Sequence, residues 1–226
     1  AEQFKQQGYA THMVGKWHLG TEPEFLPRTQ GFDHYYGMPC NYAHSPKFFD
    51  GKNEVFARTP LDRLTELYTR HITKIIGEQG DQPFFLYYAT GCGHAPHHIF
   101  QEEADAYKGK FDMGWDEYRN IVFANQKRLG FFPEDAELSD FDPDVQPWDE
   151  LSDDEKRLYT RMMEVYAGFQ TYTDRHFGRI LDFLESIDEL DNTIIMFISD
   201  NGASPEGGDV GSLNEYDFFN FLGEDL

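Results

Sequence analysis

Two residues that can bind an anion, Lys16 and His18, stand two positions apart between Gly15 and Gly20. They follow a short apolar stretch, residues 9–14, whose composition predicts a strand. In an extended backbone, residues two apart point the same way, so the ammonium and the imidazole could converge on one anionic group. Taken alone, such a pair is more typical of a surface turn with two solvated side chains, and the wider pattern must decide between these interpretations.

Two further apolar stretches, residues 83–89 and 192–199, also predict strands and also end in polar residues. His94 follows the first of them, and Asp200 and Asn201 follow the second. Because ligands of α/β sheets bind beyond the carboxyl ends of the strands, the three loops are predicted to form one site.

Asp200 and Asn201 offer a carboxylate and an amide carbonyl, which are oxygen ligands suited to Ca²⁺ or Mg²⁺. Asp-Asn-Gly is also an ordinary turn at the end of a strand, and for the pair alone the turn is the better interpretation.

The loop GCGHAPHH contains three histidines and Cys92. The spacing of the histidines could suggest zinc, but Pro96 interrupts any helix that would place two of them on one face, so zinc is the weaker interpretation. One histidine could instead protonate a leaving alkoxide or bind an anion, with His97 and His98 solvated at the rim. Cys92 has no identifiable base partner and is interpreted as a small loop residue rather than a nucleophile.

Helical signals separate the predicted strands, so the fold class is α/β. The chain opens on a helix end closed by Gly8. Further helices are predicted from Thr59 to about Gly80, from Trp115 to Leu129, and from a capping box at Ser152 to about Ile187. The aromatic segment Gly31–Gly37 is predicted to be a loop.

The chain is strongly acidic, with 19 basic and 41 acidic residues among 226 and a net charge of −22. This balance argues against nucleic acid or an anionic membrane surface as a partner. No run of about 18 apolar residues is present, which argues against a membrane-spanning helix. The acidic residues concentrate around 131–151, a segment interpreted as a solvated surface insert.

Several segments together resemble the sulfatase family, particularly the bacterial arylsulfatases. The pattern Gly8-Tyr9-x-Thr11-x-x-Val14-Gly15-Lys16-x-His18 is similar to a family signature at every position, and four further segments carry the likeness: GFDHYYG, PFFLYYATGCGHAPHH, DRHFGRILDFL and NTIIMFISDNGASPEGG. The resemblance implies an alkaline-phosphatase-like three-layer sandwich with a mixed central sheet. It also implies hydrolysis of sulfate esters by a formylglycine assisted by a divalent metal, usually Ca²⁺, with Mg²⁺ as the alternative.

The same resemblance implies roles for five residues. Lys16 corresponds to a lysine that contacts the sulfate, His18 to a histidine that holds the formylglycine hydrate, and His94 to a histidine beside the leaving-group oxygen. Asp200 and Asn201 correspond to a pair of metal ligands.

The family's nucleophile motif, Cys or Ser followed by x-Pro-x-Arg, is absent, because neither Cys40 nor Cys92 has this context. We therefore expect residues 1–226 to be part of a catalytic domain that is incomplete at both ends, with the formylglycine upstream of Ala1. Such a fragment is predicted to be inactive and poorly soluble by itself, and any localisation signal would lie outside it. The substrate class is a small-molecule or glycan sulfate ester. Two alternatives stay open, a phosphate or phosphonate ester hydrolase of the same superfamily and a non-catalytic relative that binds sulfoglycans or calcium.

Overall fold

The computed structural model describes residues 1–40, 47–51, 53–56, 63–95, 97–199, 202 and 211. The chain divides into two compact units. The first comprises residues 1–94 and 170–202, and the second comprises 95–169 and 203–226.

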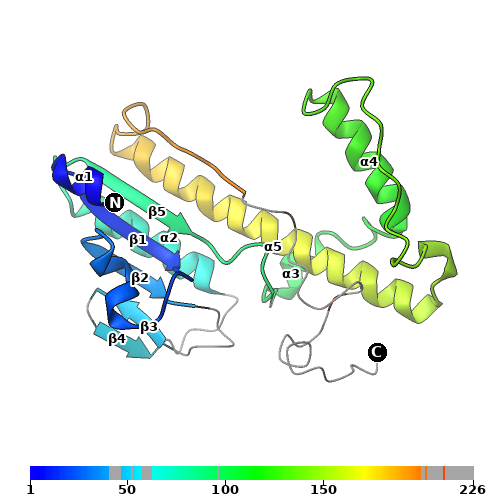
Figure 1. The fold of residues 1–226 in the computed structure, drawn as a ribbon, viewed down its shortest axis with the longest axis horizontal. Helices are drawn as coiled ribbons and strands as arrows, with labels where there is room; N and C mark the ends of the chain where they lie inside the picture. Colours follow the sequence, from blue (N-terminus) through cyan, green and yellow to red (C-terminus); the bar gives the residue numbers. More distant parts are fainter. Residues whose placement is uncertain are drawn as a thin grey trace. The chain divides into compact units, whose positions relative to one another are not determined.

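The first unit contains a mixed sheet of five strands in the order β4-β3-β2-β1-β5. The strands are β1 (Ala10–Lys16), β2 (His34–Met38), β3 (Lys47–Asp50), β4 (Asn53–Phe56) and β5 (Phe84–Ala89). β1 pairs in parallel with both β2 and β5, whereas β3 is antiparallel to β2 and to β4. Figure 1 shows β1 lying between β2 and β5. The predicted α/β class with a mixed sheet is therefore confirmed.

Alternate residues of β1 face two separate cores, because successive side chains of a strand point to opposite faces. Val14 is fully buried among Leu64, Tyr68 and Ile72 of helix α2 (Leu64–Gly77), and this core also contains Ile180 and Leu184 of helix α5 (Asp153–Ser186). Met13 is fully buried on the other face with Phe32 and Tyr35. β1, the strand that leads to Lys16, is thus packed on both faces.

Local sequence signals located the helices of the first unit. Helix α1 (Glu2–Gln6) ends before Gly8, whose φ of 86° is the left-handed conformation expected after a helix. In α2, residues 64, 68, 72 and 76 form one buried stripe with the predicted helical spacing. The predicted start of this helix at Thr59 lies outside the described residues.

The second unit is built on helices α3 (Gln101–Asp105) and α4 (Gly114–Arg128) and on the first part of α5. α5 begins with the predicted capping box. The backbone N–H of Ser152 donates to Glu155 at 2.7 Å, and the backbone N–H of Glu155 donates to the Ser152 hydroxyl at 3.3 Å. No helix in the described part of the chain has both the length and the apolar character needed to cross a membrane.

The acidic segment 131–151 packs against α4. Arg119 donates to the carbonyl oxygen of Ser139 at 2.7 Å, and its guanidinium lies 5.2 Å from the centre of the Phe141 ring. The backbone N–H of Trp148 donates to the Asp116 carboxylate at 2.8 Å. These contacts hold the segment on the helix through its backbone and aromatic residues, while most of its carboxylates remain exposed.

Two predictions were wrong. Residues 31–37 are not a loop throughout, because from His34 onward they enter β2. Residues 193–199 form no strand in the structure, although their apolar run predicted a buried one. Ile194 is 91% exposed and Met196 is 77% exposed, because no described strand pairs with this segment. β5 is a strand as predicted, but as the edge of the described sheet it is only half-buried.

Candidate active site

Lys16 is the last residue of β1. The ladder between β1 and β2 is extended by two hydrogen bonds, from Trp17 N–H to the Met38 carbonyl at 2.9 Å and from His18 N–H to the Pro39 carbonyl at 2.8 Å. His18 has φ 58°, a left-handed conformation that is uncommon for a residue with a side chain. The simple alternation expected for an extended Lys-x-His pair therefore does not describe these two residues. A strained backbone held by neighbouring hydrogen bonds is a feature of functional loops.

The parallel pairing of β1 and β5 brings the second predicted loop to the same edge of the sheet. Gly15 stands opposite Ala89, so Lys16 and the loop that begins at Thr90 leave neighbouring strands in the same direction. His94 lies in this loop, where its backbone N–H donates to the Gly91 carbonyl at 3.3 Å. Two of the three predicted loops thus follow the carboxyl ends of neighbouring parallel strands, as the strand pattern predicted.

For the third predicted loop, the structure describes the preceding segment but not the proposed metal ligands. Asp200 and Asn201 lie outside the described residues, and residues 193–199 before them form no strand of the sheet. The strand predicted before this loop is therefore absent from residues 193–199, and the placement of the metal-ligand pair stays a prediction.

Cys92 is poorly suited to be a nucleophile. Burial raises the pKa of its thiol, and a hydrogen bond with Thr173 offsets this effect only in part. Because the thiolate is the reactive form, a raised pKa leaves the group less reactive at neutral pH. This agrees with the interpretation of Cys92 as a small loop residue.

His97 has an aromatic environment rather than that of a rim residue. Its ring centre lies 5.2 Å from that of Tyr166 and 6.2 Å from that of Phe169, all within the second unit. His98 is exposed, as predicted for a solvated residue.

Sequence reasoning missed the role of Thr11. Its hydroxyl donates to the Gly31 carbonyl at 2.8 Å and lies 3.0 Å from the Asp33 carboxylate, while the Asp33 backbone N–H lies 2.9 Å from the same hydroxyl. The Thr11 backbone N–H also donates to that carboxylate, at 3.2 Å. Lys5 and Thr11 together lower the pKa of Asp33 against the opposing effect of burial. This network, which we call the Thr11–Asp33 clamp, fixes the segment before β2 against β1. The sequence Gly-Phe-Asp directly before an aromatic run was the available signal.

Comparison with known proteins agrees with this architecture. Residues 1–220 match the family model for sulfatases. An uncharacterized sulfatase of Schizosaccharomyces pombe is 32% identical over 222 residues, which cover 89% of this chain and 40% of that protein. An arylsulfatase of Klebsiella aerogenes is 28% identical, with coverage of 92% and 48%. The chain therefore spans less than half the length of these relatives.

Solved structures show the same fold at low sequence identity. A protein from a study of glycosaminoglycan metabolism in Bacteroides thetaiotaomicron superposes with a TM-score of 0.59 at 19% identity, covering 98% of this chain and 48% of that one. A second protein, solved in complex with its substrate D-glucosamine-2-N,6-O-disulfate, gives a TM-score of 0.54 at 18% identity and covers 85% of this chain and 47% of its own. The mixed sheet, the paired loops at its edge and a family match over nearly the whole length agree: the chain belongs to the sulfatase family.

Proposed function

We propose that the protein containing this chain hydrolyses sulfate esters. We also propose that the loops at the carboxyl ends of β1 and β5 form one wall of its active site. The observation that carries the proposal is the parallel pairing of these strands, which places Lys16 and the His94 loop at the same end of the sheet. Membership of the sulfatase family supports the reaction class.

Each of the three basic residues has a role suited to sulfuryl transfer. Lys16 binds sulfate oxygens through its ammonium group, and His18 holds the attacking group by a hydrogen bond. His94 protonates the leaving oxygen, because an alkoxide is a poor leaving group unless it gains a proton. Fixed positive charge beside the sulfate is most effective in a cleft from which water is excluded.

Asp200 and Asn201 are the residues proposed to hold a divalent metal, Ca²⁺ or Mg²⁺. Their donor set fits such an ion, because both offer the hard oxygen ligands that these cations prefer, although two ligands do not complete a site. When bound, the metal supplies positive charge where negative charge accumulates on the sulfate. The nucleophile is proposed to be a formylglycine that residues 1–226 do not include, since the motif that carries it is absent here.

Residues 1–226 are proposed to be part of the catalytic domain, and residues 131–151 to be a surface insert. The contacts of this insert with α4 support its interpretation as a surface segment that packs on that helix. Substrates are proposed to be aryl or sugar sulfates, because the relatives include an arylsulfatase of Klebsiella aerogenes and a human N-acetylgalactosamine-6-sulfatase.

The test compares turnover of an aryl sulfate and an aryl phosphate by the intact protein, with and without added Ca²⁺. Preference for the sulfate supports the proposal, preference for the phosphate favours a phosphate ester hydrolase, and absence of both activities favours a non-catalytic binder. His94→Gln is expected to lower kcat by roughly 10²–10⁴-fold, as for loss of a general acid. The matched control His98→Gln removes an exposed histidine four residues along the chain and should leave kcat unchanged. The isolated 226 residues should show no turnover.

A further inference from the structure

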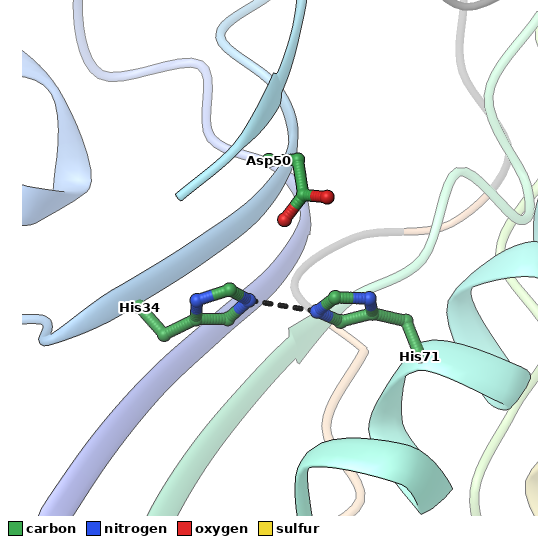
Figure 2. A group of neighbouring side chains, drawn as sticks. All are labelled: His34, Asp50 and His71. Carbon is green, nitrogen blue, oxygen red and sulfur yellow. Dashed lines mark hydrogen bonds between the residues drawn. The ribbon is translucent and has the colours of Figure 1, made fainter. Parts of the chain in front are cut away.

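Three side chains with metal-binding atoms meet on one face of the sheet in the first unit. They are His34 of β2, Asp50 at the end of β3 and His71 of α2 (Figure 2). One ligand atom from each lies within 4.8 Å of the other two. The two imidazoles face each other, and their Nε2 atoms are 2.7 Å apart.

Strand register explains why these residues meet. Tyr36 stands opposite Asp50 in the antiparallel pair of β2 and β3, so both side chains point to the same face. His34 precedes Tyr36 by two residues and shares this face. It is the face that α2 covers, since Tyr68 and Ile72 pack in the core with Val14 and Phe48. His71 lies between these two core residues in the sequence of α2, and its ring meets the ring of His34.

Stacked aromatic rings fix the two histidines. The Tyr36 ring lies parallel to the His71 ring, with an interplanar angle of 5° and centroids 3.6 Å apart. The His34 and His71 rings are inclined by only 10°. The edge of His12 approaches His34 at a centroid distance of 6.1 Å. Ligands whose rings are held by their neighbours lose little freedom when they bind an ion.

We propose that His34, Asp50 and His71 bind a divalent transition-metal ion, with Zn²⁺ as the best match. Two imidazole nitrogens and one carboxylate oxygen are a common three-residue zinc set, and water completes a tetrahedron. Asp50 is exposed whereas both histidines are half-buried, so the carboxylate side provides the entry path for the ion and its water. Ca²⁺ and Mg²⁺ prefer oxygen ligands and are not expected to bind here.

Binding requires a small rearrangement. At 2.7 Å the two nitrogens share a hydrogen bond, in which one ring donates and the other accepts. Zn–N bonds of about 2.0–2.1 Å at a tetrahedral angle place two nitrogens about 3.3 Å apart. The imidazoles must therefore separate by roughly 0.6 Å. The ring that donates must also change tautomer, its proton moving from Nε2 to Nδ1, so that both Nε2 atoms can bind the ion. The competing interpretation is a histidine pair joined only by this hydrogen bond.

The site does not depend on the proposed sulfate ester hydrolysis. It uses none of the residues assigned to that reaction, and its oxygen and nitrogen ligands differ from the all-oxygen pair Asp200 and Asn201. A failure of one proposal leaves the other untouched.

The test is calorimetric titration of the intact protein that contains this chain with ZnCl₂ in a non-chelating buffer, with excess CaCl₂ present to fill oxygen-only sites. One Zn²⁺ ion is expected to bind at this site and to raise Tm, because the ion links two strands to a helix. His34→Gln and His71→Gln should each weaken Zn²⁺ affinity by at least about tenfold, since loss of even a supporting residue costs that much. The matched control His98→Gln also removes one histidine and should leave the affinity unchanged.

Asp50→Asn is the variant that guards against loss of folding. Asp50 is exposed, and its replacement keeps the shape of the side chain while removing the charge. Co²⁺ absorption gives a second readout, because four-coordinate Co²⁺ has visible bands that six-coordinate Co²⁺ in water largely lacks. Weaker Zn²⁺ binding and loss of these bands in Asp50→Asn support the site. Equal affinity in all the variants, or no Zn²⁺ binding by the unaltered protein, overturns it.

Discussion

Gly15 of β1 lies so close to Ala89 of β5 that a Cβ atom on Gly15 would be 1.9 Å from the Ala89 carbonyl oxygen. Gly15 also has φ 114°, a conformation that residues with side chains rarely adopt. The glycine therefore permits the close approach of the two strands whose ends carry Lys16 and the His94 loop.

Gly15→Ala is expected to destabilise the chain by about 3 kcal/mol or more, since it combines backbone strain with a backbone clash. Urea unfolding followed by circular dichroism measures the change. Gly91→Ala is the matched control. A Cβ there meets nothing within 4 Å, so the free energy of unfolding should change by less than about 0.5 kcal/mol. Equal losses in the two variants would contradict the observed packing.

Thr11→Val tests the Thr11–Asp33 clamp. Valine has the shape of threonine but leaves the Gly31 carbonyl and the Asp33 N–H without the hydroxyl, so a loss of about 1–3 kcal/mol is expected. Thr73→Val is the control, because the Thr73 hydroxyl only donates to Arg70 within its own helix. The same unfolding assay applies, and a Thr11 variant as stable as the control would show that the clamp adds nothing.

Ile194→Thr tests whether residues 193–199 are exposed, where the apolar run predicted a buried strand. Ile194 is 91% exposed, so its replacement should change the free energy of unfolding by less than about 0.5 kcal/mol. Ile72→Thr makes the same change at a fully buried position and should cost about 2–4 kcal/mol. Thermal unfolding of both variants checks the contrast. A large loss in Ile194→Thr would mean that the segment is packed after all.

His12 should make the stability of the chain depend on pH. Burial lowers its pKa and outweighs the opposing effects of the hydrogen bond with Gln79 at 2.7 Å and of the Asp33 charge. His34, whose ring lies near that of His12, also has a pKa lowered by burial. As pH falls below about 6.5, the unfolded chain takes up a proton that the folded chain does not, so stability is lost.

The contribution of His12 is at most about 1.4 kcal/mol per pH unit. His12→Gln removes the titrating ring and keeps a polar partner for Gln79, so its urea midpoint should fall less between pH 7.5 and 5.5. His98→Gln serves as the control because His98 is exposed. A slope in His12→Gln identical to that of the unaltered chain would refute the assignment.

Local signals in the sequence predicted the longer helices α2, α4 and α5, whereas the short helix α3 was not predicted. The capping box at Ser152 and Glu155 predicted the start of α5 because both partners lie within one turn. β2 was missed since its formation depends on pairing with β1, which is distant in sequence, and an aromatic segment between glycines has no clear alternation.

The loops of the candidate site could be predicted only where the strands before them could be predicted. β5 has a continuous apolar run and β1 a shorter, mixed one, and their parallel pairing brings their loops together. Residues 193–199 have an equally apolar run, but composition does not reveal whether a strand has a partner to pair with. The His34, Asp50 and His71 cluster gave no sequence signal, because its members come from three elements and meet only through register.

Most residues of the eleven-residue pattern that first suggested the family have structural roles. Gly8 ends a helix, Thr11 anchors the next segment, Val14 fills a core and Gly15 admits a neighbouring strand. Tyr9 packs edge-on against Phe4, so Lys16 and His18 are left for the proposed roles at the substrate. A descendant that lost its activity but kept its fold would therefore retain most of the pattern, so in this lineage a signature match measures common ancestry better than it measures working chemistry.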